Sequence, residues 1–492
     1  MISAIATLVC LVFVAKLMRI DRAASVGLSK ALWVPTVWFL YCASRPLDEW
    51  FLTGQRIEGG GGIESGSMLD RNFLTLLLVV GLAILLRRRI NWTQAMRNNF
   101  WLFALLLFML VSILWSDFPF VSLKRWVRTA GTAMMALVVL SEAEPYEAIY
   151  AILRRTMYLV IPFSLLLVKY YPRLGVVFGR WSGQALYSGV TLTKNTLSEV
   201  CVLFIFMFIW SRARKRDLEE SAPAIRGQNA CEWVLLAMVC YLMKGPSGYG
   251  AQSVTYSATG VAVLAIGLGL FFLMRRFRSS LAQLGGWTAL LLVGGGVVTV
   301  ALYLMGTSPM AVVARLMGRD PTLTGRSDQI WSVLLPIAWH NPVLGLGYGA
   351  FWIRPVPGLI LDVNEAHNGY LDVFIELGIF GLVLVALAAW MYLRKARHEI
   401  HENFYWGAFR MSYLVMFLCH NWTETTLLRS REILWNLFVL LAVVYPKEWT
   451  GYVSGERIPE EEPLELEETP LEVEAVSAPP AVRRGGTENA KT

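Results

Sequence analysis

A short polar segment leads into a long apolar stretch, and it holds the groups of this chain best suited to acid–base chemistry. The segment, residues 364–370, reads Asn-Glu-Ala-His-Asn-Gly-Tyr, with His367 at its centre. A neutral imidazole can accept a proton from a hydroxyl group or orient it. Polar groups beside a membrane span are costly, so they usually serve a function. His367 is therefore the candidate general base, and capping of the following helix is the alternative.

Three carboxyl groups lie near His367 in the sequence, and helix geometry separates them. Asp372 and Glu376 are four residues apart and share one face of a straight helix. Glu376 is nine residues from His367, about 180° around the axis. Asp372 or Glu365 is thus the expected partner of His367, unless the helix bends at Gly369. We expect Glu376 to meet a polar group of another span.

Arginines and a lysine recur near the ends of the apolar stretches. Arg125 and Arg128 lie three residues apart where one stretch begins, so they share a helix face. Lys194 and Asn195 begin another stretch, and Arg326 lies in a long polar segment. These cations are candidates for binding an anionic ligand, the alternative being side chains that reach water or lipid headgroups. Further candidates for lining the same cavity are Arg45, Asn195, Asn368, His420 and Glu424.

The composition indicates which elements position these residues. Of the 492 residues 56% are hydrophobic and 16% are charged, which is typical of a polytopic membrane protein and excludes an ordinary soluble enzyme. Apolar stretches able to cross a hydrocarbon core of about 30 Å recur along the chain. We predict an all-α polytopic integral membrane protein with about 12–14 transmembrane helices. The expected spans are 2–18, 29–43, 72–86, 100–115, 126–141, 155–171, 195–211, 231–243, 254–274, 286–305, 370–393, 406–420 and 432–446.

Short basic loops alternate with longer loops of mixed charge, and this pattern predicts the orientation. The basic loops are 19–30, 87–97, 212–216, 275–278 and 394–397. They are expected in the cytoplasm. The segments 44–71, 172–194 and 306–369 are expected on the outer side, together with the amino terminus. The candidate cations then lie outside, against the orientation rule, and an anionic ligand on that face would explain them.

The chain divides into four regions. Residues 1–305 are predicted to form membrane helices 1–10, residues 306–369 a large outer loop with short helices, and residues 370–447 helices 11–13. The tail, 448–492, is different in kind, because residues 456–492 carry ten acidic and four basic residues with five prolines. A segment of this composition buries too little apolar surface to fold. We predict a disordered cytoplasmic tail.

Several other functions are not favoured by the sequence. The six cysteines lie within or at the ends of apolar stretches without paired spacing, which indicates packing. The five histidines form no metal-ligand motif, and the glycine runs lack the strand and lysine of a phosphate-binding loop. We therefore expect no metal, no cofactor and no nucleic-acid partner.

Six segments, taken in series, resemble the O-antigen ligase and polymerase superfamily, and within it the branch of exopolysaccharide-production polymerases. The segments are Ser44–Trp50, Trp115–Trp126, Thr191–Leu197, Gly325–Trp331, Asn341–Gly347 and Glu365–Leu371. One segment departs from the pattern, because Thr193 and Ser198 stand where many members carry His and Gly. Lys194 is then the cation at that point.

The resemblance implies a glycosyltransferase of the bacterial inner membrane whose active site faces the periplasm. Its donor would be an undecaprenyl-diphosphate-linked oligosaccharide, and its acceptor a second glycan or a lipid. Arg125, Arg128, Lys194 and Arg326 would stabilise the leaving diphosphate in place of a metal ion. His367 and Arg326 would be the catalytic residues. Membrane lipids and a chain-length regulator are further expected partners.

Three functions remain open on the sequence. The first is a polymerase that joins lipid-linked repeat units into an exopolysaccharide or O-antigen. The second is a ligase that transfers the glycan to lipid A-core or another acceptor. The third is a transporter or flippase, in which the outer cations only bind the diphosphate. Inverted repeats would favour transport, and the sequence has no clear repeat.

Overall fold

The computed structural model describes residues 1–51, 67–88, 90–179, 183–218, 227–246, 257–278, 326–354, 356, 359 and 363–444. The predicted span 286–305 and the predicted tail 448–492 lie outside the described residues. The amino-terminal part of the predicted outer loop, 306–325, also lies outside them. Everything below concerns the described residues.

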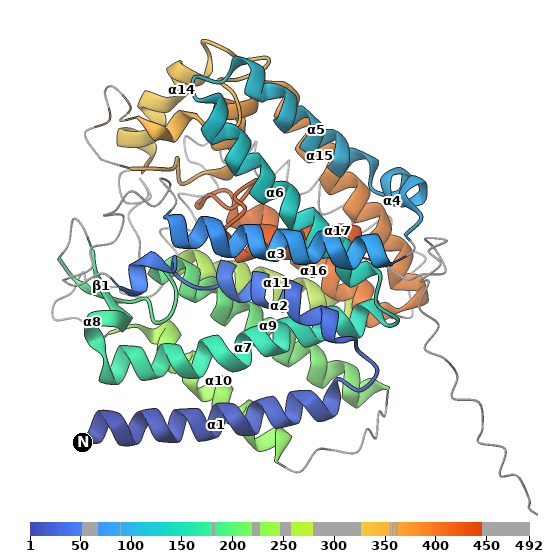
Figure 1. Ribbon diagram of the computed structural model, residues 1–492. Coiled ribbons are helices and arrows are strands. Elements are labelled where there is room, and N and C mark those ends of the chain that lie inside the picture. The colour runs from blue at the N-terminus through green and yellow to red at the C-terminus, as the bar shows by residue number, and fades with distance from the viewer. Residues whose placement is uncertain are drawn as a thin grey trace, which may run out of the picture. The chain divides into compact units, whose positions relative to one another are not determined.

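Helices make up almost all of the described structure (Figure 1). They are α1 (Ile2–Ala24), η1 (Lys30–Leu32), α2 (Trp33–Cys42), η2 (Asp48–Trp50), α3 (Met68–Arg87), α4 (Trp92–Asn98), α5 (Phe100–Val111), η3 (Ser112–Trp115), α6 (Pro119–Leu140), α7 (Pro145–Tyr170), α8 (Pro172–Gly175), α9 (Lys194–Asp217), α10 (Gln228–Lys244), α11 (Ala258–Arg276), η5 (Arg326–Trp331), α14 (Ser332–Ala338), η6 (Phe351–Ile353), α15 (Gly369–Glu402), α16 (Phe404–His420) and α17 (Ile433–Val443). A two-stranded antiparallel hairpin, β1 (Val176–Phe178) with β2 (Ala185–Tyr187), is the one departure from helix among these residues.

The predicted class, an all-α polytopic membrane protein, is confirmed. Each predicted span that falls within the described residues coincides with a helix. By length and apolar composition alone, six described helices could cross a membrane, or seven if the α4–α5 pair, bent by 91°, forms one span. The six are α1, α3, α7, α9, α11 and α15. The other predicted spans include α2 and α17, with 10 and 11 residues, which are shorter than a membrane crossing requires without help from their flanks.

The helices pack so that segments far apart in the sequence become neighbours. α1 and α2 both pack against α7, and α3 packs against α6 (Figure 1). α15 packs against α5 and α16, while α11 packs against α9 and α16. The core between these helices is apolar and aromatic, with Trp38, Trp210, Trp406 and Trp435 fully buried.

The two ends of this helix bundle differ in their charged residues and in the contacts that these make. At one end, which we call the basic end, the predicted basic loops pair with acids. Arg88 contacts Glu142 at 2.8 Å, and Arg275 contacts Asp217 at 2.7 Å. The opposite helix ends carry the predicted outer segments, and we call this the loop end. Contacts across it include the donation from Tyr41 Oη to Asp70 Oδ1 at 2.8 Å.

Helix α15 is broken near the loop end, and a loop from the predicted outer segment fills the break. Gly378 has φ +64° within this helix, a conformation that favours glycine. The backbone groups released there bond to the Asn341–Gly347 segment. Leu346 N donates to the carbonyl of Ile375 at 2.9 Å, and Ile379 N donates to that of Pro342 at 2.8 Å. Irregular backbone at membrane depth is tolerated when it is satisfied by protein in this way.

Candidate active site

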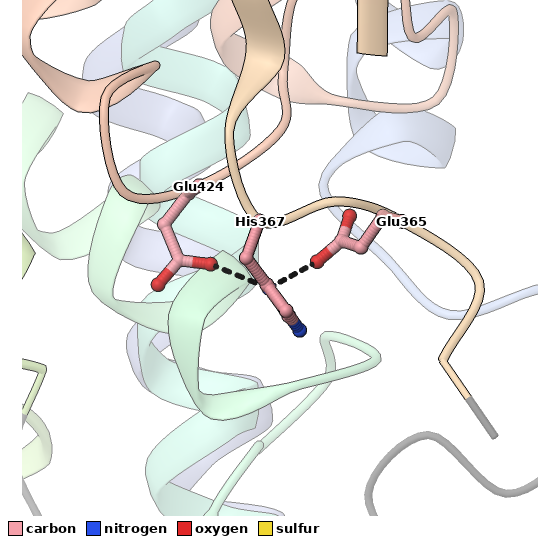
Figure 2. A group of neighbouring side chains, drawn as sticks. All are labelled: Glu365, His367 and Glu424. Carbon is pink, nitrogen blue, oxygen red and sulfur yellow. Dashed lines mark hydrogen bonds and ion pairs between the residues drawn. The ribbon is translucent and has the colours of Figure 1, made fainter. Parts of the chain in front are cut away.

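His367 lies between two carboxylates at the loop end of the bundle (Figure 2). Its Nδ1 is 2.8 Å from Glu365 Oε1 and 3.4 Å from Glu424 Oε2. Glu365 lies on the same segment, whereas Glu424 belongs to the turn after α16. A carboxylate accepts, so both contacts favour a hydrogen on Nδ1. The ring is therefore arranged to accept a proton at Nε2, which points away from both carboxylates (Figure 2).

The backbone of His367 is held in an uncommon conformation. Its φ is +50°, a left-handed value found in only a few per cent of non-glycine residues. The residues on both sides are anchored: Ala366 N donates to the carboxylate of Asp372 at 3.3 Å, and Asn368 N donates to Thr425 Oγ1 at 3.1 Å. A strained residue fixed by its neighbours is a frequent feature of functional sites.

Asn368 and Gly369 attach this segment to the turn that carries Glu424. Asn368 Oδ1 caps α15 by accepting from Tyr370 N and Leu371 N, each at 3.1 Å. Gly369 N donates to the carbonyls of Asn421 and Glu424. A Cβ at Gly369 would lie 2.2 Å from Asn421 Oδ1, so only glycine permits this approach. The fold thus brings Glu424 to His367 across 57 residues.

Asp372 does not fill the role predicted for it. Its carboxylate accepts from Trp352 Nε1 at 2.8 Å and from Ala366 N, and it lies 3.3 Å from Arg429 Nη2. It positions the backbone before His367, while Glu365, the other predicted partner, makes the contact with the ring. The reason is that Asp372 is inside the first turn of α15 and turned towards the predicted outer segment, not towards the imidazole.

Glu376 meets a backbone donor from outside its own helix. Its Oε2 accepts from Gly349 N at 3.0 Å, and its side chain is buried. Arg125, also buried, donates to the carbonyl of the same Gly349. His367 lies before the start of α15, so the nine-residue spacing along a straight helix does not describe how it lies relative to Glu376. Arg125 and Glu376 together hold one loop residue, which indicates a positioning role for both.

Arg128 and Arg429 place positive charge beside this loop. Both are half-buried. Burial raises the pKa of Tyr348 to about 12, and the nearby charges of Arg429 and Arg128 oppose that rise. Tyr348 Oη donates to the carbonyl of Leu428 at 2.9 Å, which joins the loop to the turn carrying Arg429. These arginines are better placed than Arg125 to offer charge to a ligand.

A separate cavity lies next to the His367 group. It is lined in part by Asn195, Glu199 and His420, and Lys194 lines a neighbouring cavity that shares Ser198. His420 Nε2 is 3.6 Å from Glu199 Oε1, and both side chains are buried. Asn195 and His420, which were both predicted to line a cavity, line this one. His367 is not among the described residues that line it.

Arg45 has contacts that indicate a structural role instead of the predicted place in the cavity. The side chain is fully buried. Its guanidinium donates to the carbonyls of Leu174 at 2.6 Å and Val190 at 3.3 Å, and also to that of Gly189. It also lies over the Trp50 ring, 4.3 Å from the centroid. Arg45 therefore fastens the segment around the β1–β2 hairpin to the end of α2.

The backbone of Arg326 begins η5, a π-helical turn that continues into α14. Its side chain lies outside what the structure describes. The same element is tied to the His367 segment, because Trp331 Nε1 donates to the carbonyl of Ala366 at 2.9 Å. The predicted pairing of Arg326 with His367 in one site therefore stays a prediction.

Comparison with known proteins finds two similarities. Residues 251–386 match the O-antigen ligase family model, and this range contains Arg326, Glu365 and His367. Over 304 residues the chain is 25% identical to the exopolysaccharide production protein ExoQ of Rhizobium meliloti (strain 1021). Part of the chain is thus similar to the O-antigen ligase family and to an exopolysaccharide production protein. The predicted resemblance is thereby confirmed, including its exopolysaccharide-production branch.

The alignment with this relative is partial. It covers 58% of this chain and 62% of the relative, so the chain spans less than two thirds of that protein's length. Within the part that matches the O-antigen ligase family, His367 stands beside the broken start of α15, where the Asn341–Gly347 segment is inserted. Two of the sequence segments that suggested the resemblance, Gly325–Trp331 and Glu365–Leu371, are in direct contact through the bond from Trp331 Nε1 to the carbonyl of Ala366.

The turn between α16 and α17 is the part of this candidate site that the sequence patterns indicated least. Residues 421–432 supply Glu424 and Thr425 to the His367 segment, and Arg429 to Asp372. Its threonines and Glu424 are buried despite their polarity. A twelve-residue polar run between two apolar helices was the available signal. Glu199 and Glu432, buried or half-buried near this group, were also missed.

Glu365, His367 and Glu424 form a group that could hold a metal ion. One ligand atom from each lies within 4.8 Å of the others. Imidazole and carboxylate are ligands for several divalent cations. No sequence spacing could reveal this group, because Glu424 comes from a different helix pair. The group could hold a cation as well as a proton.

Glu432 gives a pH-dependent prediction. Burial, together with the Glu365 and Glu424 carboxyls, raises the pKa of Glu432 to about 7, against the pull of Arg431 and Arg429. The folded protein therefore keeps a proton that the unfolded chain releases at lower pH, so stability falls as pH rises from the usual carboxyl range through 7. Glu432→Gln should abolish this part of the fall.

The measurement is the thermal unfolding midpoint of the purified protein in detergent at pH 5 and pH 8. We expect the wild type to lose roughly 2–4 °C more than Glu432→Gln between these values. Glu402→Gln, which changes an exposed carboxyl at the basic end, is the control and should follow the wild type. Equal losses in all three proteins would contradict the assignment.

Proposed function

We propose that this chain is a membrane glycosyltransferase of polysaccharide biosynthesis that uses a lipid-diphosphate-linked oligosaccharide as donor. The observation that carries the proposal is the imidazole of His367, held at Nδ1 between the carboxylates of Glu365 and Glu424. Family membership supports the same conclusion. The donor is taken to be undecaprenyl-diphosphate-linked, as the family resemblance implies.

The proposed reaction requires few protein groups, namely a proton acceptor and cations beside the leaving diphosphate. The acceptor hydroxyl oxygen attacks the anomeric carbon, and its proton passes to His367 Nε2. The bond from that carbon to the diphosphate oxygen breaks, and the lipid diphosphate leaves with the electron pair. A diphosphate leaves without being protonated, so its growing negative charge needs fixed cations instead. Arg128, Lys194, Arg326 and Arg429 are proposed for this role, since the first and last are half-buried at the loop end.

The two carboxylates improve His367 as a base. A negative charge 2.8 Å from Nδ1 stabilises the imidazolium that forms after proton transfer. It also fixes the ring and its tautomer, as the acidic partner does in other His-dependent enzymes. This arrangement has no evident purpose in a protein that only binds and releases its ligand. It favours transfer over transport.

The broken helix α15 is the observation that could favour a transporter. Transporters of several folds bind substrate at unwound helices whose free backbone groups line a cavity. Here the backbone groups released near Gly378 bond to the Asn341–Gly347 segment. They are thus occupied by protein and offer nothing to a substrate. We therefore keep transport as the alternative and transfer as the proposal.

Polymerisation of repeat units is proposed over ligation, because the curated relative is an exopolysaccharide production protein. The active site would face the periplasm, with the basic end in the cytoplasm, in line with the orientation rule. The deciding experiment uses purified protein and a lipid-diphosphate glycan. Lengthened glycan chains indicate a polymerase, and a product on lipid A-core indicates a ligase. Translocation without transfer would overturn the proposal.

Metal-independent transfer leads to a further prediction. If arginines and lysine stabilise the diphosphate, a chelator should leave the rate unchanged. Added Zn²⁺ should inhibit, because it would occupy Glu365, His367 and Glu424 and take the place of the proton. Blocking a general base lowers the reaction rate by about 10²–10⁴-fold. The measurement is initial transfer rate against Zn²⁺ concentration, with and without a chelator.

Glu365→Gln separates this inhibition from a general effect of the ion. Loss of a carboxylate from the group should raise the inhibitory Zn²⁺ concentration about 10–100-fold, comparable to the loss of a supporting group at a metal site. Glu402→Gln should leave it unchanged. A reaction abolished by the chelator and restored by a divalent cation would show that the site is a metal centre, contrary to this proposal.

A further inference from the structure

A solvent-open cavity lies at the basic end, between the end of α11 and the corner that joins α15 to α16. It encloses about 900 Å³ of space that is open to solvent. Its lining residues are Arg275, Arg276, Arg278, Ile400, His401, Glu402 and Phe404. The cavity is at the opposite end of these helices from His367, so it does not belong to the proposed active site.

The three arginines of this cavity differ in whether a described acidic residue pairs with them. Arg275 is neutralised by Asp217 through two contacts of 2.7 and 2.8 Å. Arg276 and Arg278 are exposed, and neither forms an ion pair with another described residue. The guanidinium of Arg278 lies 4.8 Å from the centre of the Phe404 ring, which holds it at the cavity wall. Two positive charges therefore remain available there.

These charges match a phosphate group. A guanidinium can meet phosphate oxygens through two parallel hydrogen bonds, and it stays charged at any physiological pH. Glu402 also lines the cavity and opposes an anion, but it is a single negative charge against Arg276 and Arg278. Arg275 is already balanced by Asp217. The net charge presented to a ligand is therefore positive.

An apolar surface continues directly from the cavity along α11. Phe272, Leu273 and Phe277 are 44%, 40% and 38% exposed. Phe272 lies four residues before Arg276, so the two share a helix face one turn apart. A free anion would make no use of this surface, whereas the acyl chains of a lipid would cover it. The cation pair and the apolar face together select a molecule with both parts.

We propose that this cavity binds an anionic phospholipid of the adjoining leaflet, with its phosphate between Arg276 and Arg278 and its acyl chains along Phe272 and Leu273. Basic pockets between membrane helices are known to take such headgroups. The lipid would join α11 to the α15–α16 corner. The other ends of α15 and α16 carry the His367 segment and the Glu424 turn. The site is independent of the reaction proposed above.

The experiment uses the purified full-length chain, stripped of lipid in detergent and examined by native mass spectrometry. Phosphatidylglycerol and phosphatidylcholine of the same chain length are added in turn. We expect phosphatidylglycerol to bind at least about tenfold more tightly, because both lipids bring a phosphate to Arg276 and Arg278 but only phosphatidylcholine also brings a choline cation, which these arginines repel. Equal binding of both lipids would overturn the proposal.

Variants and a competitor distinguish the remaining outcomes. The double variant Arg276→Ala/Arg278→Ala should lose the preference for phosphatidylglycerol. The matched control Arg394→Ala/Arg397→Ala removes two exposed arginines from the same end of the bundle and should keep it. Inorganic phosphate should not displace the lipid at millimolar concentration, and full displacement would assign the site to a free anion. If the double variant does not purify, the lipid comparison and the phosphate competition on the wild type still decide the proposal.

Discussion

His367→Ala should lower the rate of glycan transfer by about 10²–10⁴-fold with little change in donor binding, because a positioned general base contributes that much. The loss should appear in kcat, since the ring acts on the acceptor hydroxyl as the bond forms. Glu424→Gln and Glu365→Gln should each cost less, because either carboxylate alone still holds Nδ1. The measurement is transfer of a lipid-diphosphate glycan by purified variants.

His340→Ala is the matched control for this experiment. It removes an imidazole from the same outer segment, but one whose Nδ1 is engaged with the carbonyl of Pro336 at 2.9 Å in an exposed turn. It should transfer at the wild-type rate. A His367→Ala protein with wild-type kcat would rule out the base role. If the variant loses transfer in the same proportion as donor binding, the residue orients the donor instead.

Arg326→Ala should lower transfer by about 10²–10³-fold, because removal of one group that stabilises developing negative charge has this effect in other enzymes. Arg326→Lys should recover only part of the rate, since an ammonium keeps the charge but cannot form the two parallel bonds of a guanidinium. The position begins η5, next to the element that Trp331 ties to the His367 segment.

Arg354→Ala provides the comparison for Arg326→Ala. Arg354 lies in the same predicted outer segment, and its guanidinium rests over the Phe118 ring, 4.6 Å from the centroid. Its replacement removes the same charge and should leave transfer almost unchanged. Equal losses in the two variants would mean that general charge at this end matters, not a bound diphosphate. An unaffected Arg326→Ala protein would remove Arg326 from the mechanism.

The sequence alone does not separate an arginine that binds the protein's own backbone from one that could bind a ligand. Arg45 and Arg128 look alike in the sequence, since both follow or begin an apolar stretch. The fold buries Arg45 against three carbonyls and leaves Arg128 half-buried beside Tyr348. Whether a guanidinium serves the protein's own backbone or a ligand depends on which loop lies next to it. That neighbour is set by packing and not by local pattern.

The sequence by itself determined the class and the positions of the described helices, and it indicated the similarity to the O-antigen ligase family, because each rests on local composition or on motifs in series. Only the tertiary structure decided that Glu424 reaches His367 across 57 residues, and that Asp372 holds Ala366 instead of the ring. Hydrogen bonds between distant segments depend on how helices pack and where loops meet. A linear pattern of apolar and polar residues does not contain that information.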